Sequence, residues 1–280
     1  MKRKNLRWPL LALLFSTAIS GCGDSDSDGT IAGPGVEAGT GRVYAVDQVT
    51  FPTIDSIQIS ALFGVLDGAI KNRTVILVHE LGTGKEEWLQ NTSLFLDLLE
   101  NGYNVLALDL RGHGGTALPD GRLQISLEDL ESSYLDVSAA VTWLQARPEV
   151  DAGRVAVIGD GVGGNVAFVI MGAIPQRIKA AVALSPGIWV GQDAQPAVIG
   201  AGINPFGPHS ILYLVGSADV LPLDDGRVLS YAGFAGSLAT ITTDPNLIVF
   251  DGATDHGLAL LNNIPAASES LFLWLESHLQ

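Results

Sequence analysis

The sequence is poor in cysteine, histidine and basic residues. Cys22 is the one cysteine among 280 residues, so an intramolecular disulfide is excluded. The five histidines are scattered along the chain without the spacing of metal ligands, and we expect neither a metal nor another cofactor. Lysine and arginine number 15 against 30 aspartates and glutamates, which gives a formal net charge of −15. An acidic surface of this kind repels phosphate backbones and argues against binding of nucleic acid.

Long hydrophobic runs are also absent after the N-terminal segment, so no second segment is long enough to span a membrane. The N-terminal segment itself has four basic residues within its first seven, a short apolar run over residues 10–19, and small residues before Cys22. This order is typical of a secretory signal.

The end of that segment, ISGC at residues 19–22, resembles the lipobox of bacterial lipoproteins. The resemblance implies cleavage before Cys22 and acylation of this cysteine, and we favour it over an ordinary signal peptide with a free cysteine. Residues 23–41 are rich in Gly, Ser and Asp without hydrophobic periodicity, which predicts a flexible tether. We therefore expect a signal peptide over 1–22, a tether over 23–41 and one domain over 42–280, held by lipid on the extracytoplasmic side of a bacterial cell envelope.

Strand and helix patterns alternate along the domain. This alternation predicts an α/β fold, with a mainly parallel central sheet and helices on both of its faces. The first two strands read as an antiparallel pair, and residues 189–208, rich in Gly and Pro, read as a small cap or loop over the site. The expected strands cover residues 43–50, 57–66, 74–79, 103–109, 155–158, 180–184, 211–215 and 247–250, and the expected helices cover residues 86–100, 127–147, 163–170 and 266–278.

The chain is organised around RVAVIGDGVGGNVA, residues 154–167. An apolar strand runs into a sharp glycine turn and then into a small, apolar helix. This is the context of a nucleophile elbow, G-x-S-x-G, in which the two flanking glycines avoid clashes between the strand end and the first helical turn. Gly159 and Gly163 take the flanking positions, and Gly161 stands where the nucleophilic serine is expected. The elbow is present without its nucleophile.

Ligands and catalytic groups in such sheets lie beyond the carboxyl ends of the strands. His79 and Glu80 follow one expected strand, Asp160 follows the elbow strand, and Asp219 and His256 follow the last two. We therefore expect these side chains to lie around one site.

The ordered set of motifs resembles the α/β-hydrolases, in particular dienelactone-hydrolase-like and related esterases, from residue 43 to the C-terminus. The matching pieces are HELG at 79–82, DLRGHG at 109–114 and GDGVGGN at 159–165. The resemblance implies that Asp219 orients His256, and that the N–H groups of Val162 and of a residue near Leu81 form an oxyanion hole. Two positions depart from the family pattern, namely Gly161 in place of serine and Glu80 in place of the usual glycine.

Three substitutes for the missing serine are open. Asp160 stands one position early in the turn, and its side chain is expected to point away toward a neighbouring loop or solvent. Ser185 follows the next strand and reads as a cap of its own turn. A water molecule activated by His256 and Asp219 is chemically reasonable but slow without covalent catalysis.

Two functions follow from these residues. The first is a pseudo-hydrolase that binds a small acyl or ester-type ligand, or a protein partner, in the ancestral pocket. The second is a hydrolase of esters or related acyl compounds that uses the dyad of Asp219 and His256 with water or with another nucleophile. The loss of the serine favours the first, because a missing triad serine lowers turnover on the order of a million-fold in a model protease.

Overall fold

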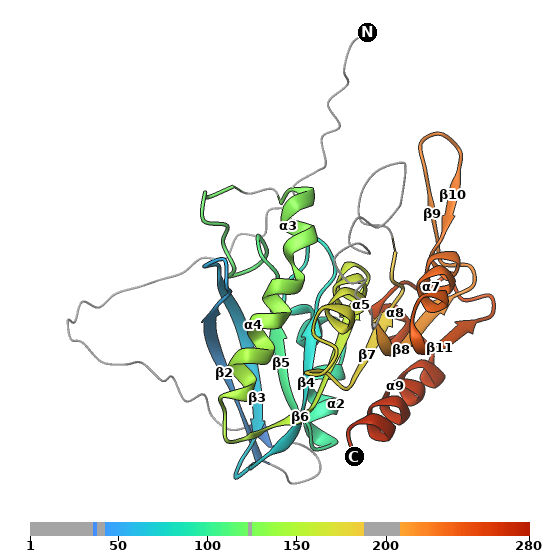
Figure 1. The fold of residues 1–280 in the computed structure, drawn as a ribbon. Helices are drawn as coiled ribbons and strands as arrows, with labels where there is room; N and C mark the ends of the chain where they lie inside the picture. The colour runs from blue at the N-terminus through green and yellow to red at the C-terminus, as the bar shows by residue number, and fades with distance from the viewer. Residues whose placement is uncertain (1–35, 38–42, 123–124, 188–207) are drawn as a thin grey trace, which may run out of the picture. The chain divides into compact units, whose positions relative to one another are not determined.

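A computed structural model describes residues 36–37, 43–122, 125–187 and 208–280 (Figure 1). The expected signal peptide with Cys22, all of the tether except residues 36–37, and the expected cap over 189–208 except Pro208 lie outside the described residues. Within the described part of the chain, none of the helices has both the length and the apolar character needed to cross a membrane.

The centre of the domain is a nine-stranded sheet, counted over the described residues, with the order β1-β2-β3-β5-β4-β6-β7-β8-β11 (Figure 1). The pairs from β5 through β11 are parallel, whereas β1, β2, β3 and β5 pair antiparallel. The predicted mainly parallel sheet and its antiparallel first pair are thereby confirmed. The strands are β1 (Val36–Glu37), β2 (Val43–Pro52), β3 (Gln58–Leu66), β4 (Asn72–Val78), β5 (Asn104–Leu108), β6 (Val150–Asp160), β7 (Ala180–Leu184), β8 (His209–Gly216) and β11 (Thr243–Phe250).

Helices cover both faces of the sheet, because alternate residues of the central strands point to opposite sides. In β4, Ile76 and Val78 pack into one buried cluster together with α3 (Leu127–Ser132), α4 (Tyr134–Gln145), α5 (Val162–Ala173) and α7 (Tyr231–Thr240). Val75 and Leu77 pack into the other cluster with α1 (Glu87–Gln90), α2 (Leu94–Glu100), α8 (Leu258–Asn263) and α9 (Pro265–His278). The continuous apolar run of β4 is thus explained by burial on both faces.

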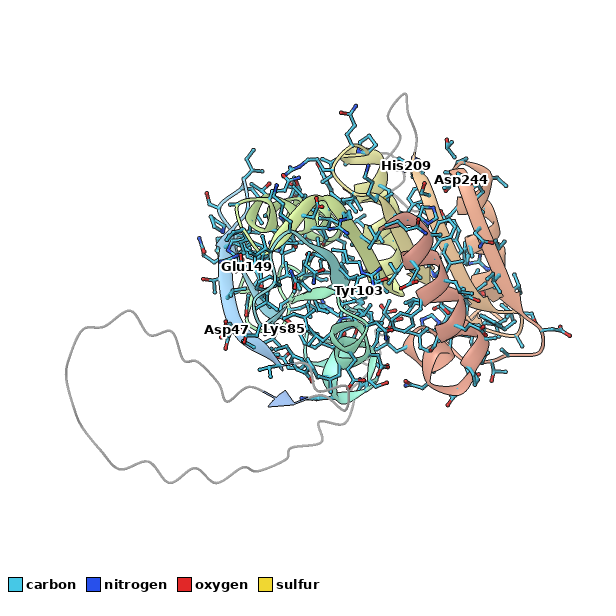
Figure 2. All side chains as sticks on the ribbon, turned by 90° about the horizontal axis from the view of Figure 1, so that it is seen from below. Asp47, Lys85, Tyr103, Glu149, His209 and Asp244 are labelled. Carbon is cyan, nitrogen blue, oxygen red and sulfur yellow. The ribbon has the colours of Figure 1, made fainter. Side chains whose placement is uncertain are left out.

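The second cluster also holds a polar aromatic side chain. Tyr103, labelled in Figure 2, is fully buried there, and the Arg73 guanidinium lies 4.0 Å from the centre of its ring. A planar cation over an aromatic face is attracted by the ring quadrupole, so Arg73 covers this end of the core.

Two expected helices are each divided in the structure. Residues 86–100 form α1 and α2, separated at Asn91–Ser93, and the helix expected after Ser126 divides into α3 and α4 at Ser133. Asn, Thr and Ser compete for backbone hydrogen bonds and favour helix ends, which accounts for both breaks. Ser126 caps α3, and Asp129 completes a reciprocal capping box with it.

Five of the described elements were not predicted. One is β1, which pairs with β2 at two residues of the expected tether. The others are α7, α8 and the hairpin of β9 (Val220–Pro222) and β10 (Val228–Ser230), which forms a separate two-stranded sheet. The hairpin is too short and too exposed to show a burial pattern in the sequence.

Candidate active site

The turn between β6 and α5 has the geometry of a nucleophile elbow. Gly161 adopts a positive φ of 47°, and its N–H donates to the carbonyl of Leu184 at 2.9 Å. A Cβ on Gly159 would lie 2.0 Å from the carbonyl oxygen of Gly163, and a Cβ on Gly163 would lie 2.0 Å from that of Val78. Both flanking glycines are therefore required by close backbone approach, as the sequence indicated.

The two predicted triad partners meet beside this turn. His256 follows β11 and Asp219 follows β8, and His256 Nδ1 lies 2.9 Å from Asp219 Oδ2. Asp219 is 3% exposed, so its carboxylate is available chiefly to the imidazole. The ring of Tyr231, a residue that the sequence did not single out, lies 4.3 Å from the ring of His256, centre to centre.

The carboxylate of Glu80 occupies the place that a serine at position 161 would need. A Cβ built on Gly161 would lie 1.3 Å from Glu80 Oε2, far closer than any contact allows. The Val162 N–H donates to this carboxylate, 3.2 Å from Oε1 and 3.3 Å from Oε2, and the Leu81 N–H donates to Oε1. The two N–H groups expected to form an oxyanion hole are thus directed at a carboxylate of the protein itself.

The same carboxylate also faces the histidine. His256 Nε2 lies 3.5 Å from Glu80 Oε2, so the imidazole stands between the carboxylates of Asp219 and Glu80. Burial alone would lower the pKa of His256, but hydrogen bonds to these two carboxylates outweigh it and raise the pKa to about 10. At neutral pH the ring is an imidazolium, which cannot accept a proton from a nucleophile.

Two further carboxyl groups are buried near the site. Glu87 accepts a hydrogen bond from the Glu80 N–H at 3.1 Å, and burial raises its pKa to about 7. Asp160 is 5% exposed, and its Oδ1 lies 1.9 Å from where a Cβ of Gly257 would be. Burial, with the nearby Glu87 and Glu80 carboxylates, raises the pKa of Asp160 well above its usual value. Of the two directions expected for the Asp160 side chain, the structure shows the neighbouring loop and not solvent, because the loop that carries His256 covers it.

His79 is likewise buried behind the site rather than at its surface. Its Nε2 accepts a hydrogen bond from the Leu110 N–H at 2.9 Å, which leaves the proton on Nδ1 to be donated to the Glu80 carbonyl at 2.7 Å. Burial lowers the pKa of His79 to about 4, so the ring stays neutral. The prediction that His79 lines the site is corrected, since this side chain instead fixes the backbone of the loop that bears Glu80.

A cavity of about 290 Å³ opens over Glu80 and His256. Its far wall includes Gly187, which Asn165 holds through hydrogen bonds of 2.6 and 3.0 Å to the carbonyl and N–H of Gly187. Ser185 does not cap its own turn, because its Oγ accepts from the Gly257 N–H at 3.0 Å and it is fully buried. The lining residues are Glu80, Leu81, Gly161, Val162, Gly187, Tyr231 and His256.

Asn165, Gly187 and Tyr231 were missed by sequence reasoning. Asn165 could have been found from the motif GDGVGGN, whereas Tyr231 belongs to a helix that was not predicted. Among the described residues, no group of three or more His, Cys, Asp or Glu side chains is placed to hold a metal ion.

Residues 70–209 match the family described as serine aminopeptidase, S33. The chain belongs to this family of α/β-hydrolases. The S33 match spans β4 to the beginning of β8 and therefore includes Glu80, the elbow and Asn165. The predicted α/β-hydrolase fold is confirmed, and the narrower likeness to dienelactone hydrolases stays a prediction.

Solved structures with the same fold include esterases. An esterase of Pyrococcus furiosus is 21% identical with a TM-score of 0.62, over 84% of this chain and 93% of that one. Acetyl xylan esterase 1 of a Thermoanaerobacterium species is 16% identical with a TM-score of 0.61, over 83% of each chain. Similarities at this level of identity establish the fold of this S33 family member and leave its activity open.

One curated protein is similar in sequence as well. It is the dihydrolipoyllysine-residue acetyltransferase component of an acetoin cleaving system from Cupriavidus necator, 28% identical over 181 residues. The match covers 64% of this chain and 43% of that protein, so this chain spans less than half of its relative's length.

Proposed function

We propose that this domain is a pseudo-hydrolase of esterase ancestry, which binds a small ligand in its cavity and has lost acyl transfer through a serine. The observation that carries the proposal is the position of Glu80. Its carboxylate fills the space of the missing serine and accepts hydrogen bonds from both N–H groups of the expected oxyanion hole. It also lies against His256. No serine at position 161 can attack an ester to form a tetrahedral intermediate. The N–H groups that would stabilise the oxyanion of this intermediate are already bonded to Glu80.

Hydrolysis of p-nitrophenyl acetate by the purified protein tests this proposal, with His256→Ala as the background. We expect equal rates for the two proteins. A wild-type rate about tenfold or more above the His256→Ala rate would contradict the proposal, since general-base catalysis by histidine contributes on the order of a hundredfold or more.

One observation favours a second candidate, a weak ester hydrolase that uses water. The pair of His256 and Asp219 is intact at 2.9 Å, although the serine is gone. In such an enzyme the rate rises with pH as His256 loses its proton, and it disappears in Asp219→Ala. The same assay therefore separates the two candidates.

We also propose that the protein is a lipoprotein anchored through Cys22. The support is the sequence of residues 1–22 alone, with its basic start, short apolar run and ISGC ending. We expect Cys22→Ala to move the protein from the membrane fraction to the soluble fraction of cells that express it. A variant that stays with the membranes would contradict the anchor, and immunoblotting of both fractions is sufficient to decide.

A further inference from the structure

One carboxylate, that of Glu80, faces a donor from each of three segments: the loop after β4, the elbow and the loop after β11. The Leu81 and Val162 N–H groups donate to Glu80, and His256 Nε2 lies 3.5 Å from its Oε2. The Glu80 carboxylate thus occupies a position in which the carboxylate of a bound ligand would meet the same donors.

Two of the three donors are held by groups other than the Glu80 side chain. The hydrogen bond from the Gly161 N–H to the Leu184 carbonyl fixes the turn that orients the Val162 N–H, and Asp219 holds His256 through Nδ1. Moving the Glu80 carboxylate away therefore leaves the Leu81 and Val162 N–H groups and the Nε2–H of His256 without an acceptor, while Nδ1 stays paired with Asp219. Leaving such donors unpaired is unfavourable, and another anion in the same place restores their hydrogen bonds.

The Glu80 side chain is the movable part of this arrangement. Its side chain is 26% exposed and lies on the wall of the cavity, so the carboxylate has a path to solvent. Its backbone stays in place when the side chain leaves, because the N–H donates to Glu87 and the carbonyl accepts from the Thr83 N–H at 3.2 Å.

We propose that the ligand of this cavity is a small monocarboxylic acid, which displaces Glu80 and takes over its three donors. The inference rests on the proposed function and names the class of ligand for it. The remaining walls suit a compact apolar body, since Tyr231, Leu81, Val162 and Gly187 face a space of about 290 Å³. A cationic ligand fits less well, because the Glu80 carboxylate already has three donors.

Calorimetric titration with sodium benzoate tests this assignment, with benzamide as the uncharged isostere. Removal of the internal competitor in Glu80→Ala is expected to tighten benzoate binding about tenfold or more over wild type, while benzamide stays weak. Glu269→Ala, which removes an exposed carboxylate on α9, is the matched control and should bind as wild type does. Equal affinity of folded Glu80→Ala for benzoate and benzamide would overturn the proposal, as would an absence of benzoate binding.

A second variant and a second readout guard against misfolding. Glu80→Gln keeps the shape of the side chain and removes its charge, so it should bind benzoate more tightly than wild type does. In both variants the pKa of His256, followed by nuclear magnetic resonance, is expected to fall and to rise again when benzoate is added. A pKa of His256 that does not respond to benzoate would place the ligand elsewhere and overturn the proposal.

These results are separable from those on the proposed function. Ester turnover above the His256→Ala rate contradicts the pseudo-hydrolase and leaves the acid site standing. Failure of benzoate to bind overturns the acid site alone.

Discussion

Position 161 and position 80 form one unit at the active site. Gly161 lacks the side chain of a nucleophile. The Glu80 carboxylate fills the volume that this side chain would take and accepts the hydrogen bond of the Val162 N–H. From the sequence alone, Gly161→Ser would be expected to restore esterase activity. The structure adds a condition, because the new Cβ would lie 1.3 Å from Glu80 Oε2.

We therefore predict that Gly161→Ser by itself stays at the background rate, whereas Gly161→Ser combined with Glu80→Gly hydrolyses p-nitrophenyl acetate. The expected gain of the double variant over wild type is about a hundredfold, well short of the roughly million-fold that a triad serine contributes in a model protease. The measurement is the initial rate of p-nitrophenol release by proteins whose fold is checked by circular dichroism.

His256→Ala in the double-variant background is the control for that gain. Loss of the gain identifies His256 as the general base. An inert, folded double variant would show that more of the site has decayed than the two positions considered.

At the scale of elements, the elbow depends on how closely β4, β6 and α5 approach one another. The carbonyl oxygens that would touch a Cβ on Gly159 or Gly163 belong to the backbone, which cannot rotate away as a side chain does. Added methyl groups here must move a strand or a helix, and overpacking of this kind is costly.

We predict that Gly163→Ala lowers the free energy of unfolding by about 3 kcal/mol or more. Gly236→Ala is the matched control, since Gly236 lies in α7 with no atom within 4 Å of an added Cβ. There the substitution should raise stability by about 0.5–1 kcal/mol through helix propensity. Urea unfolding of both variants gives the comparison, and similar effects of the two substitutions would contradict the close approach at Gly163.

At the scale of the whole molecule, the buried titratable groups around the site set the pH dependence of stability. Folding raises the pKa of Glu87 from 4.5 to about 7 and that of His256 from 6.5 to about 10. The folded state therefore binds more protons than the unfolded chain does. The stability that Glu87 and His256 contribute to the folded state is lost as pH rises through those pKa values. Neutral His79 opposes this trend below pH 6.5, because its pKa falls to about 4.

We predict that the urea midpoint is highest near pH 5 and declines toward pH 9, as repulsion within an acidic chain also increases. Glu87→Gln keeps an acceptor for the Glu80 N–H and cannot ionise. This variant should decline less steeply between pH 4.5 and pH 7, although buried Asp160, whose pKa is also raised, keeps its own contribution, and the decline above pH 7 through deprotonation of His256 should remain. An unchanged profile in Glu87→Gln would show that Glu87 does not titrate in this range.

The sequence by itself determined the fold and the positions of the reacting groups. Continuous apolar runs between helical patterns specify buried parallel strands, and the strand ends carry Asp219, His256 and the elbow glycines to one edge. These local signals were sufficient to predict the edge at which the groups lie and the vacant position at Gly161, whereas the roles of Asp219, His256 and the oxyanion N–H groups came from the resemblance to α/β-hydrolases.

The tertiary structure alone decided what fills the vacancy. The sequence marks Glu80 as unusual, but residues 80 and 161 follow different strands, β4 and β6, and only their proximity in the fold shows that the Glu80 carboxylate fills the place of a side chain at position 161. Contacts between distant segments also decide three other features of the site. They bury His79 and Asp160, they set the charge of His256, and they bring Tyr231 to the cavity. Burial and charge pairing set pKa values through space, so no pattern along the chain contains them.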